Sequence, residues 1–308
     1  MNDVTTRLDV ELPAHDGVTL RGWLYRPGGA PDAPGPAVVM THGFSATRAM
    51  ALDRFAEVFA EGGLTVLVYD HRGLGTSDGE PRQVIDRWIQ ARDHRAALTW
   101  LAARDEVDVS RIGIWGSSYA GGVAMVVGAV DRRVRAVVAN VPWAGSPDVD
   151  SVDADAAFAA IRDALDDPDG PGTVTMRGTP AGPAAVVEEP GELLPAFLPQ
   201  PESREWFLRA GRVAGSGWEN RVWFGVPPAD APAFDPGVAV AHVAPTPLLM
   251  VVATDDDLAA TDVTLAAFER AGEPKSLELI EGHHFVCYDG DAFTRAATRA
   301  RNFFVESL

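Results

Sequence analysis

The chain of 308 residues has a single cysteine, Cys287, and few basic residues. One cysteine cannot form an intrachain disulfide, and no zinc-type spacing of cysteine and histidine can be built around it. Lys and Arg number 26 against 44 Asp and Glu, which gives a formal net charge of −18. A surface of this sign repels phosphate backbones and anionic lipid. We therefore expect no nucleic-acid partner, no membrane partner, no metal and no cofactor.

Long apolar runs are also absent. The N-terminus has no apolar segment of the kind that signal peptides contain. The longest apolar stretch, at 122–130, is far shorter than the roughly 20 residues of a membrane-spanning helix. We expect a cytoplasmic protein, with a homodimer left open. Because 46% of the residues are hydrophobic, the chain can bury a core, which excludes a disordered protein.

Strand and helix patterns alternate at both ends of the chain. Apolar strands are predicted at 19–25, 37–40, 64–69, 111–115, 134–138, 247–252 and 276–280. Helices are predicted between them, at 54–61, 83–103, 119–130, 260–271 and 291–305. Strands that alternate with helices predict an α/β fold with a mostly parallel sheet.

The segment at 144–240 differs from both flanks. It holds 13 of the 23 prolines, and its sixteen acidic and six basic residues carry −10 of the net charge of −18. Short helices are predicted at 156–165 and 202–214. A flexible linker would leave its three tryptophans exposed, which is unusual for apolar side chains of this size. We therefore predict a folded cap at 144–240, inserted into a core made of 1–143 and 241–308.

A strand that ends in a small-residue turn, followed at once by a helix, predicts a nucleophilic serine. In this tight turn the residues two before and two after the nucleophile must be small. Around Ser118 these residues are Gly116 and Ala120. Around Ser117 they would be two large aromatic residues, so Ser118 is the predicted nucleophile.

The serine hydroxyl needs a base to remove its proton. In the chain order Ser, Asp, His, the base follows the last strand, where His283 and His284 stand side by side. The orienting acid should follow the strand at 247–252, where Asp255, Asp256 and Asp257 stand in a row. The spacing of Asp256 to Leu258 favours Asp256, with Asp255 as the alternative.

Two backbone N–H groups are predicted to bind the oxyanion that forms during acyl transfer. One belongs to Tyr119, which follows the nucleophile. The other belongs to Phe44, in the loop after the strand at 37–40. His42, just before it, is predicted to be structural. The glycine-rich turn at 70–79 has neither the P-loop spacing nor the Gly-x-Gly-x-x-Gly spacing of phosphate-binding loops. It is therefore predicted to be a structural turn.

The chain combines several motifs: His42-Gly43, Asp70-x-Arg72-Gly73-x-Gly75-x-Ser77-x-Gly79, Gly116-x-Ser118-x-Ala120-Gly121, a late aspartate and a late histidine. In this combination it resembles the α/β-hydrolase superfamily over 8–143 and 241–308. Within it, the chain looks most like the dienelactone-hydrolase and acetyl-xylan-esterase-like branch. More narrowly, the chain looks like the polyketide hydrolase, thiohydrolase and acyltransferase group. The segments that carry this likeness are 40–45, 69–73 and 80–82.

The resemblance implies an eight-stranded, mostly parallel sheet with a helical cap after the sixth strand. In these relatives the last loop reads Gly-Gly-His-Phe-x-x-Tyr, and 282–288 aligns with it, which places the base at His284. His283 takes the place of the second glycine. Cys287 lies in the same loop, and we assign it no catalytic role.

These observations predict a serine hydrolase that cleaves a small-molecule ester, thioester or lactone. We expect an apolar acyl group, for which a polyketide chain is one candidate. An acyltransferase with the same triad, a proline-type or amide peptidase, and a non-catalytic binding protein are the alternatives. Six residues are expected to line the substrate pocket: Trp143, Trp206, Phe207, Trp218, Trp223 and His283. For the aromatic residues of the cap, an equally good interpretation is that they form the core of the cap.

Overall fold

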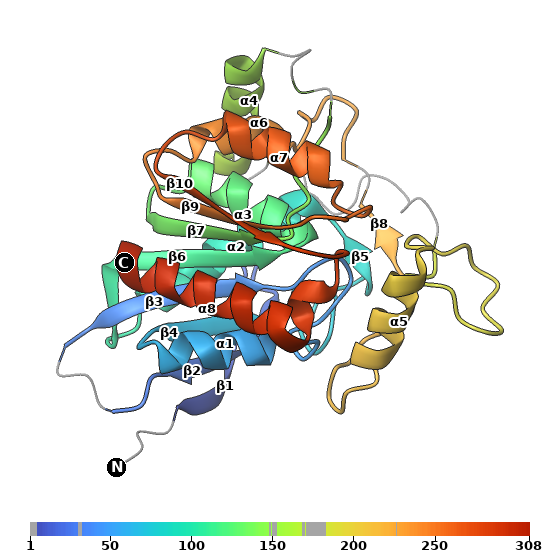
Figure 1. Cartoon of the computed structure of the whole chain (residues 1–308), viewed down its shortest axis with the longest axis horizontal. Coiled ribbons are helices and arrows are strands. Elements are labelled where there is room, and N and C mark those ends of the chain that lie inside the picture. The colour runs from blue at the N-terminus through green and yellow to red at the C-terminus, as the bar shows by residue number, and fades with distance from the viewer. Residues whose placement is uncertain are drawn as a thin grey trace.

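Eight strands form one sheet, in the order β1-β2-β4-β3-β6-β7-β9-β10 (Figure 1). This computed structural model describes residues 5–29, 33–147, 149, 153–167, 170, 183–225 and 227–308. β1 and β2 pair antiparallel, β2 and β4 do so too, and all other neighbours are parallel. The predicted eight-stranded, mostly parallel sheet is therefore confirmed. The strands are Thr6–Pro13 (β1), Thr19–Arg26 (β2), Gly35–Thr41 (β3), Thr65–Tyr69 (β4), Val107–Ser117 (β6), Val134–Asn140 (β7), Leu248–Ala253 (β9) and Lys275–Ile280 (β10).

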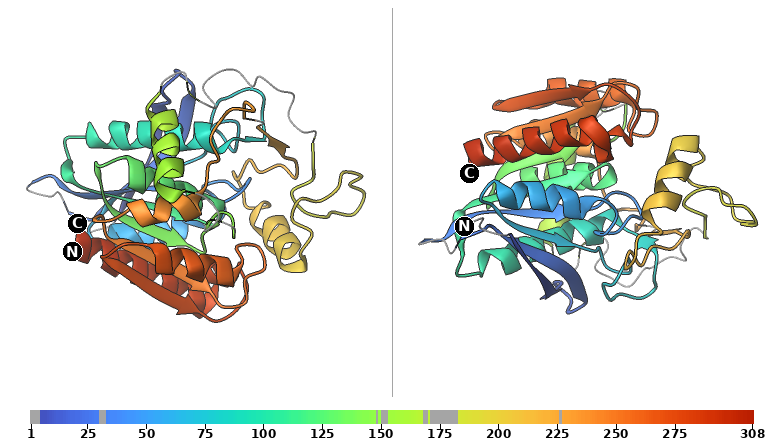
Figure 2. Two further views of the ribbon diagram at one scale, coloured as in Figure 1. Left: turned by 90° about the horizontal axis from the view of Figure 1, so that it is seen from above. Right: turned by 60° about the horizontal axis from the view of Figure 1, so that its bottom comes forward.

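Helices cover both faces of this sheet, which explains why its central strands are largely buried. Every residue of β4 and of β9 is buried. One face packs against α1 (Leu52–Glu61) and α8 (Gly290–Ser307). The other packs against α2 (Arg87–Ala102), α3 (Tyr119–Val130) and α7 (Thr261–Arg270) (Figure 2). No helix in the described ranges is long and apolar enough to cross a membrane.

The predicted helix at 83–103 starts later than expected. The Asp86 carboxylate accepts the backbone N–H groups of Trp88 and Ile89, so α2 begins only at Arg87. The two residues before Asp86 form a short strand, β5 (Val84–Ile85), that pairs in parallel with β8 (Trp223–Phe224). This pairing joins the inserted segment to the core.

The segment between β7 and β9 contains two separate helical parts. α4 (Ala154–Asp166) packs against α2 and the short helix α6 (Pro236–Ala239). α5 (Pro201–Ala210) lies with β8 beyond the carboxyl ends of the strands, away from α4 (Figures 1 and 2). The predicted helix at 202–214 therefore ends early, and Gly211 follows it with the Trp218 ring packed against its backbone. Only the part around α5 and β8 lies at the end of the sheet where a parallel α/β fold places its ligands.

Candidate active site

The turn between β6 and α3 holds Ser118 in a conformation that L-residues rarely adopt, with φ 57° and ψ −123°. The turn is so tight that a Cβ atom on Gly116 would overlap the carbonyl group of Ala120. The Ser118 carbonyl oxygen accepts hydrogen bonds from the N–H groups of Gly121 and Trp143, both at 2.9 Å. The turn therefore projects the Ser118 side chain from the end of the sheet.

Replacing Gly116 with alanine should distort this turn. Because the added methyl group would collide with backbone rather than with a flexible side chain, we expect the free energy of unfolding to fall by about 2 kcal/mol or more. Urea denaturation would measure it. Gly35→Ala is the matched control, because a Cβ there has no atom within 4 Å. A Gly116→Ala variant as stable as the Gly35→Ala variant would contradict this account of the turn.

The structure brings Ser118, His284 and Asp256 into one hydrogen-bonded chain. The Ser118 hydroxyl lies 2.8 Å from Nε2 of His284, and Nδ1 of the same ring lies 2.6 Å from Oδ2 of Asp256. A carboxylate can only accept, so Nδ1–H donates to Asp256 and Nε2 is free to accept the serine proton. The imidazole and the carboxylate are both buried. This arrangement can remove a proton from Ser118.

The Asp256 carboxylate is held in its charged form. Burial raises its pKa, but the hydrogen bond and charge of His284 and two backbone donors outweigh burial, so the net pKa lies below the usual value. The two donors are the N–H groups of Leu258 and Ala259, at 2.9 and 2.8 Å from Oδ1. An ionised carboxylate in this position can orient the imidazole without taking its proton.

The neighbouring candidates lie outside this chain of contacts. Asp255 and Asp257 are both exposed, and Asp255 accepts a hydrogen bond from the Thr254 hydroxyl at 2.8 Å. His283 is exposed too, and its Nδ1 accepts the N–H of Phe285 at 3.2 Å. Of the adjacent histidines, His284 contacts Ser118, and of the adjacent aspartates, Asp256 contacts His284.

The two backbone N–H groups predicted to bind an oxyanion are unpaired among the residues that the structure describes. Those of Phe44 and Tyr119 have no hydrogen-bond acceptor within the described part of the chain. The loop of Phe44 runs close to the nucleophile, since a Cβ on Gly43 would lie only 3.1 Å from the Ser118 Cβ. Glycine at this position lets the backbone approach the reacting atoms.

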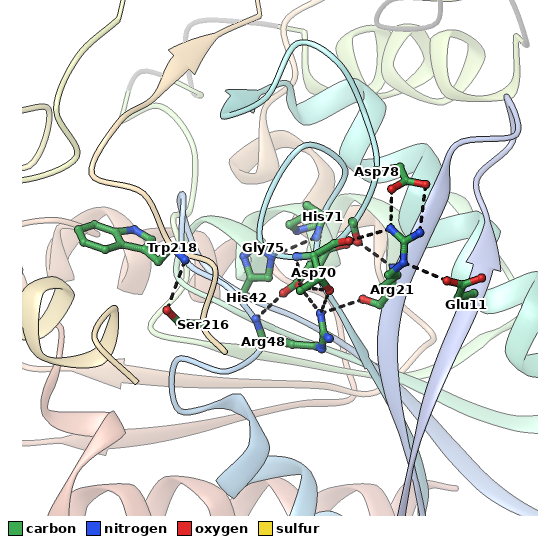
Figure 3. A network of polar contacts seen from close by, with 12 residues as sticks. Glu11, Arg21, His42, Arg48, Asp70, His71, Gly75, Asp78, Ser216 and Trp218 are labelled. Carbon is green, nitrogen blue, oxygen red and sulfur yellow. Dashed lines mark hydrogen bonds and ion pairs between the residues drawn. The ribbon is translucent and has the colours of Figure 1, made fainter. Parts of the chain in front are cut away.

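His42 fixes this loop instead of reacting. Its Nε2 accepts the N–H of His71 at 3.1 Å, so its Nδ1–H donates to the Gly43 carbonyl at 3.0 Å (Figure 3). Full burial is the main cause that lowers its pKa, so the ring stays neutral. His42 thus joins the Gly43 loop to the turn at 70–79, in the structural role that the sequence predicts.

The glycine-rich turn at 70–79 is organised around a buried carboxylate, that of Asp70 (Figure 3). It forms an ion pair with Arg48 and accepts the Arg48 and Thr76 N–H groups at 2.7 and 3.0 Å. A Cβ on Gly75 would overlap this carboxylate, which explains the glycine. The turn therefore has a structural reason for its composition and needs no phosphate.

Removing the charge of Asp70 should destabilise the fold, because Arg48 would remain buried without its partner. We expect Asp70→Asn to lower the free energy of unfolding by about 3 kcal/mol or more. Thermal unfolding followed by circular dichroism would measure it. Asp78→Asn, in the same turn but at an exposed ion pair with Arg21, should unfold close to the wild-type temperature. Equal effects of the two substitutions would contradict the prediction.

A cavity of about 410 Å³ opens beside Ser118 and His284. Most of its lining is apolar or aromatic, as in pockets that bind small organic molecules. The inserted segment contributes seven residues to it: Phe197, Leu198, Trp206, Phe207, Phe224, Gly225 and Pro227. No residue of α4 lines it. Within the described residues, no group of three or more acidic, histidine or cysteine side chains could hold a metal ion.

Three of the six expected pocket residues line this cavity: Trp143, Trp206 and Phe207. Trp218 does not, because it packs behind Phe207 with a ring separation of 5.7 Å. The Trp223 backbone pairs with β5, and its neighbour Phe224 lines the cavity in its place. His283 is exposed and does not line the cavity.

Sequence reasoning missed two groups of residues near Ser118. Phe197 and Phe224 stack on Phe44, with ring separations of 4.8 and 5.8 Å. Both lie far from Phe44 in the sequence, so no local pattern predicts these contacts. Tyr288 lines the cavity, and its hydroxyl lies 2.6 Å from that of Ser117. The tyrosine that ends the motif at 282–288 could have indicated that this residue lies close to the site.

Cys287 lies three residues after His284 but takes no part in the site. It is fully buried, and burial raises the pKa of its thiol to about 12. A protonated thiol is a poor nucleophile, so it does not compete with Ser118.

The sheet, its helices and the serine turn define an α/β-hydrolase, and comparisons with known proteins agree. The family model of X-Pro dipeptidyl-peptidase (S15 family) matches residues 16–181. The polyketide transferase ATR5 of Stachybotrys chlorohalonatus is 32% identical, over 94% of this chain and 93% of its own. The thiohydrolase aneE of Aspergillus aculeatus is 29% identical, over 92% of this chain and 88% of its own.

Among solved structures, the crystal structure of the α/β hydrolase GrgF from Penicillium sp. sh18 is similar over 98% of this chain and 99% of its own. Its TM-score is 0.74 and its identity 30%. The chain therefore belongs to the α/β-hydrolase family that includes these polyketide transferases and thiohydrolases and that the X-Pro dipeptidyl-peptidase model describes. The predicted superfamily and group are confirmed, and so is the prediction of a hydrolase-type enzyme.

Proposed function

We propose that this enzyme cleaves a carboxylic ester, thioester or lactone of an apolar acyl group through an acyl-enzyme on Ser118. The observation that carries the proposal is the position of His284, between the Ser118 hydroxyl and the Asp256 carboxylate. A neutral imidazole in this tautomer can accept the serine proton as the serine oxygen bonds to the substrate carbonyl carbon.

The steps follow from the geometry. Attack of the Ser118 oxygen moves the carbonyl electrons onto oxygen, and the Phe44 and Tyr119 N–H groups stabilise that oxyanion. A well-aimed donor of this kind contributes roughly 3 kcal/mol. The intermediate then collapses, and His284 protonates the leaving alcohol or thiol. Water attacks the acyl-enzyme with His284 again as the base, which releases the acid and restores Ser118.

We further propose that the part of the inserted segment around α5 and β8 acts as a cap that selects the acyl group. Support comes from Phe197, Trp206, Phe207 and Phe224, which close the cavity with apolar surface. Burial of a substrate chain against such surface gains roughly 25 cal/mol per Å² of apolar area. Hydrolysis should therefore become faster as the acyl chain lengthens, until the cavity is full.

Acyl transfer to an alcohol or amine is the second candidate, because several of the similar proteins are named polyketide transferases. The same triad would serve, with the acceptor in place of water. The test is to give the enzyme acyl thioesters and p-nitrophenyl esters of increasing chain length, with and without a competing alcohol or amine. Free acid as the main product supports hydrolysis, whereas acylated acceptor supports transfer. Release of p-nitroaniline from Xaa-Pro p-nitroanilides, with esters left intact, would support a peptidase and overturn the proposal.

A further inference from the structure

One end of the cavity carries opposite charges that the proposed mechanism does not use. Asp86 and Arg87, at the start of α2, both line the cavity. The Asp86 oxygen Oδ1 accepts the N–H groups of Trp88 and Ile89 at 2.9 and 3.2 Å, so it caps the helix. Among the described residues of the lining, Arg87 is the sole arginine or lysine.

The Arg87 guanidinium has no ion pair and no hydrogen bond within the described residues. It lies over the ring of Trp143, 5.2 Å from the ring centre. A cation above an aromatic face is held there weakly and keeps its N–H groups for a ligand. Because the side chain is exposed, those groups face water when no ligand is bound.

Stacked rings connect this cation to the nucleophile. The Trp143 ring lies nearly parallel to that of Tyr119, with 5.9 Å between centres and 10° between planes. Tyr119 directly follows Ser118 and lines the cavity, and its buried hydroxyl has no hydrogen-bond partner within the described residues. A substrate whose carbonyl lies at Ser118 can therefore extend along these aromatic faces towards the Arg87 guanidinium.

We propose that Arg87 binds an anionic group of the substrate, a carboxylate or a phosphate, at a distance from the carbonyl that Ser118 attacks. This proposal rests on the proposed function, because it names a substrate class for the same site. The planar guanidinium can form two parallel hydrogen bonds to either anion. The neighbouring Asp86 carboxylate repels an anion bound at Arg87, so it weakens the preference for anionic over neutral substrates.

The net charge of −18 does not argue against this site. Charges beyond about 8 Å are largely screened at physiological ionic strength, whereas a contact with Arg87 is not. An anionic group must therefore contact Arg87 itself to be stabilised by it. The preference for an anionic substrate should then depend on the length of the chain between the anion and the carbonyl at Ser118.

The experiment compares kcat/KM for two series of p-nitrophenyl esters of equal chain length. One series ends in a methyl group, and the other, the half-esters of succinic to suberic acid, ends in a carboxylate. A separate pair of thioesters tests the leaving-group side. Butyryl coenzyme A carries phosphate there, and butyryl N-acetylcysteamine is its neutral counterpart. The readout is the ratio of the anionic to the neutral substrate within each pair, so the two sources of the anion are distinguished.

In Arg87→Met, we expect the ratio of anionic to neutral substrate to fall by about ten-fold for one of the two kinds of substrate. This is the effect expected from the loss of one charge-assisted contact. The same ratio should rise in Asp86→Asn, because asparagine keeps the helix cap but removes the opposing charge. Arg135→Met, an exposed arginine near the amino end of β7, is the matched control and should change no ratio.

Unchanged ratios in both cavity variants would overturn the anion site while leaving the hydrolase proposal intact. A lower ratio in Asp86→Asn would also overturn it, because the carboxylate would then be an attractive contact. If no ester or thioester is cleaved, the proposed function fails instead. Calorimetric binding of adipate to the wild type and to Arg87→Met then decides the anion site, and equal binding to both proteins would overturn it.

Discussion

Replacing Ser118 with alanine should reduce kcat/KM for p-nitrophenyl butyrate by at least about 10⁴-fold. The variant lacks the oxygen that forms the acyl-enzyme, and only the oxyanion donors and substrate binding remain. Its fold should be kept, because the hydrogen bonds that Ser118 makes to the surrounding turn come from its backbone. Ester hydrolysis at matched protein concentration, with circular dichroism as a check on folding, would measure the effect.

Ser117→Ala is the matched control, since the two serines are neighbours. The Ser117 hydroxyl bonds to that of Tyr288 at 2.6 Å and accepts the Asn140 side-chain N–H at 2.9 Å. Its removal leaves buried polar groups without a partner, so we expect a loss of stability of about 1–3 kcal/mol with a rate within about ten-fold of the wild type. A larger loss of rate in Ser117→Ala than in Ser118→Ala would mean that the nucleophile is misassigned.

Replacing Asp256 with asparagine should lower kcat by about 10³- to 10⁴-fold. Asparagine preserves the shape of the side chain, but its amide cannot stabilise the imidazolium, and it favours the wrong tautomer of His284. Asp255→Asn and Asp257→Asn are matched controls that also remove one negative charge. Both side chains are exposed, so their rates should stay within about two-fold of the wild type. A large effect from either control, or a small one from Asp256→Asn, would contradict the assignment of the acid.

The parts of the site that could be predicted from the sequence are those that local sterics determine. The small residues at 116 and 120 select Ser118, because only small side chains fit a turn in which Ser118 itself has φ 57°. The nearly all-apolar strand at 64–69 predicts a parallel sheet, because helices cover both faces of such a sheet. The choice of Asp256 also follows from a local pattern, the spacing of an aspartate and an aliphatic residue two positions later, Leu258.

The inserted segment could not be predicted to the same depth, because its contacts join residues far apart in the chain. β5 and β8 have two residues each, too few for a periodic signal, yet their pairing brings Phe224 into the cavity. Trp218 and Trp223 are aromatic, as pocket residues often are, but Trp218 packs against Phe207 and Trp223 is the first residue of β8. Composition predicts a cap with aromatic residues, but the pairing of β5 with β8 decides which of its rings line the cavity.

The most direct test of the central claim is to label the enzyme with a fluorophosphonate and to locate the adduct by peptide mass spectrometry. We expect one phosphonyl group, on the Ser118 oxygen, absent from Ser118→Ala and formed far more slowly in His284→Ala. An enzyme that hydrolyses esters but is labelled at Ser117, or that retains its label in Ser118→Ala, would contradict the account.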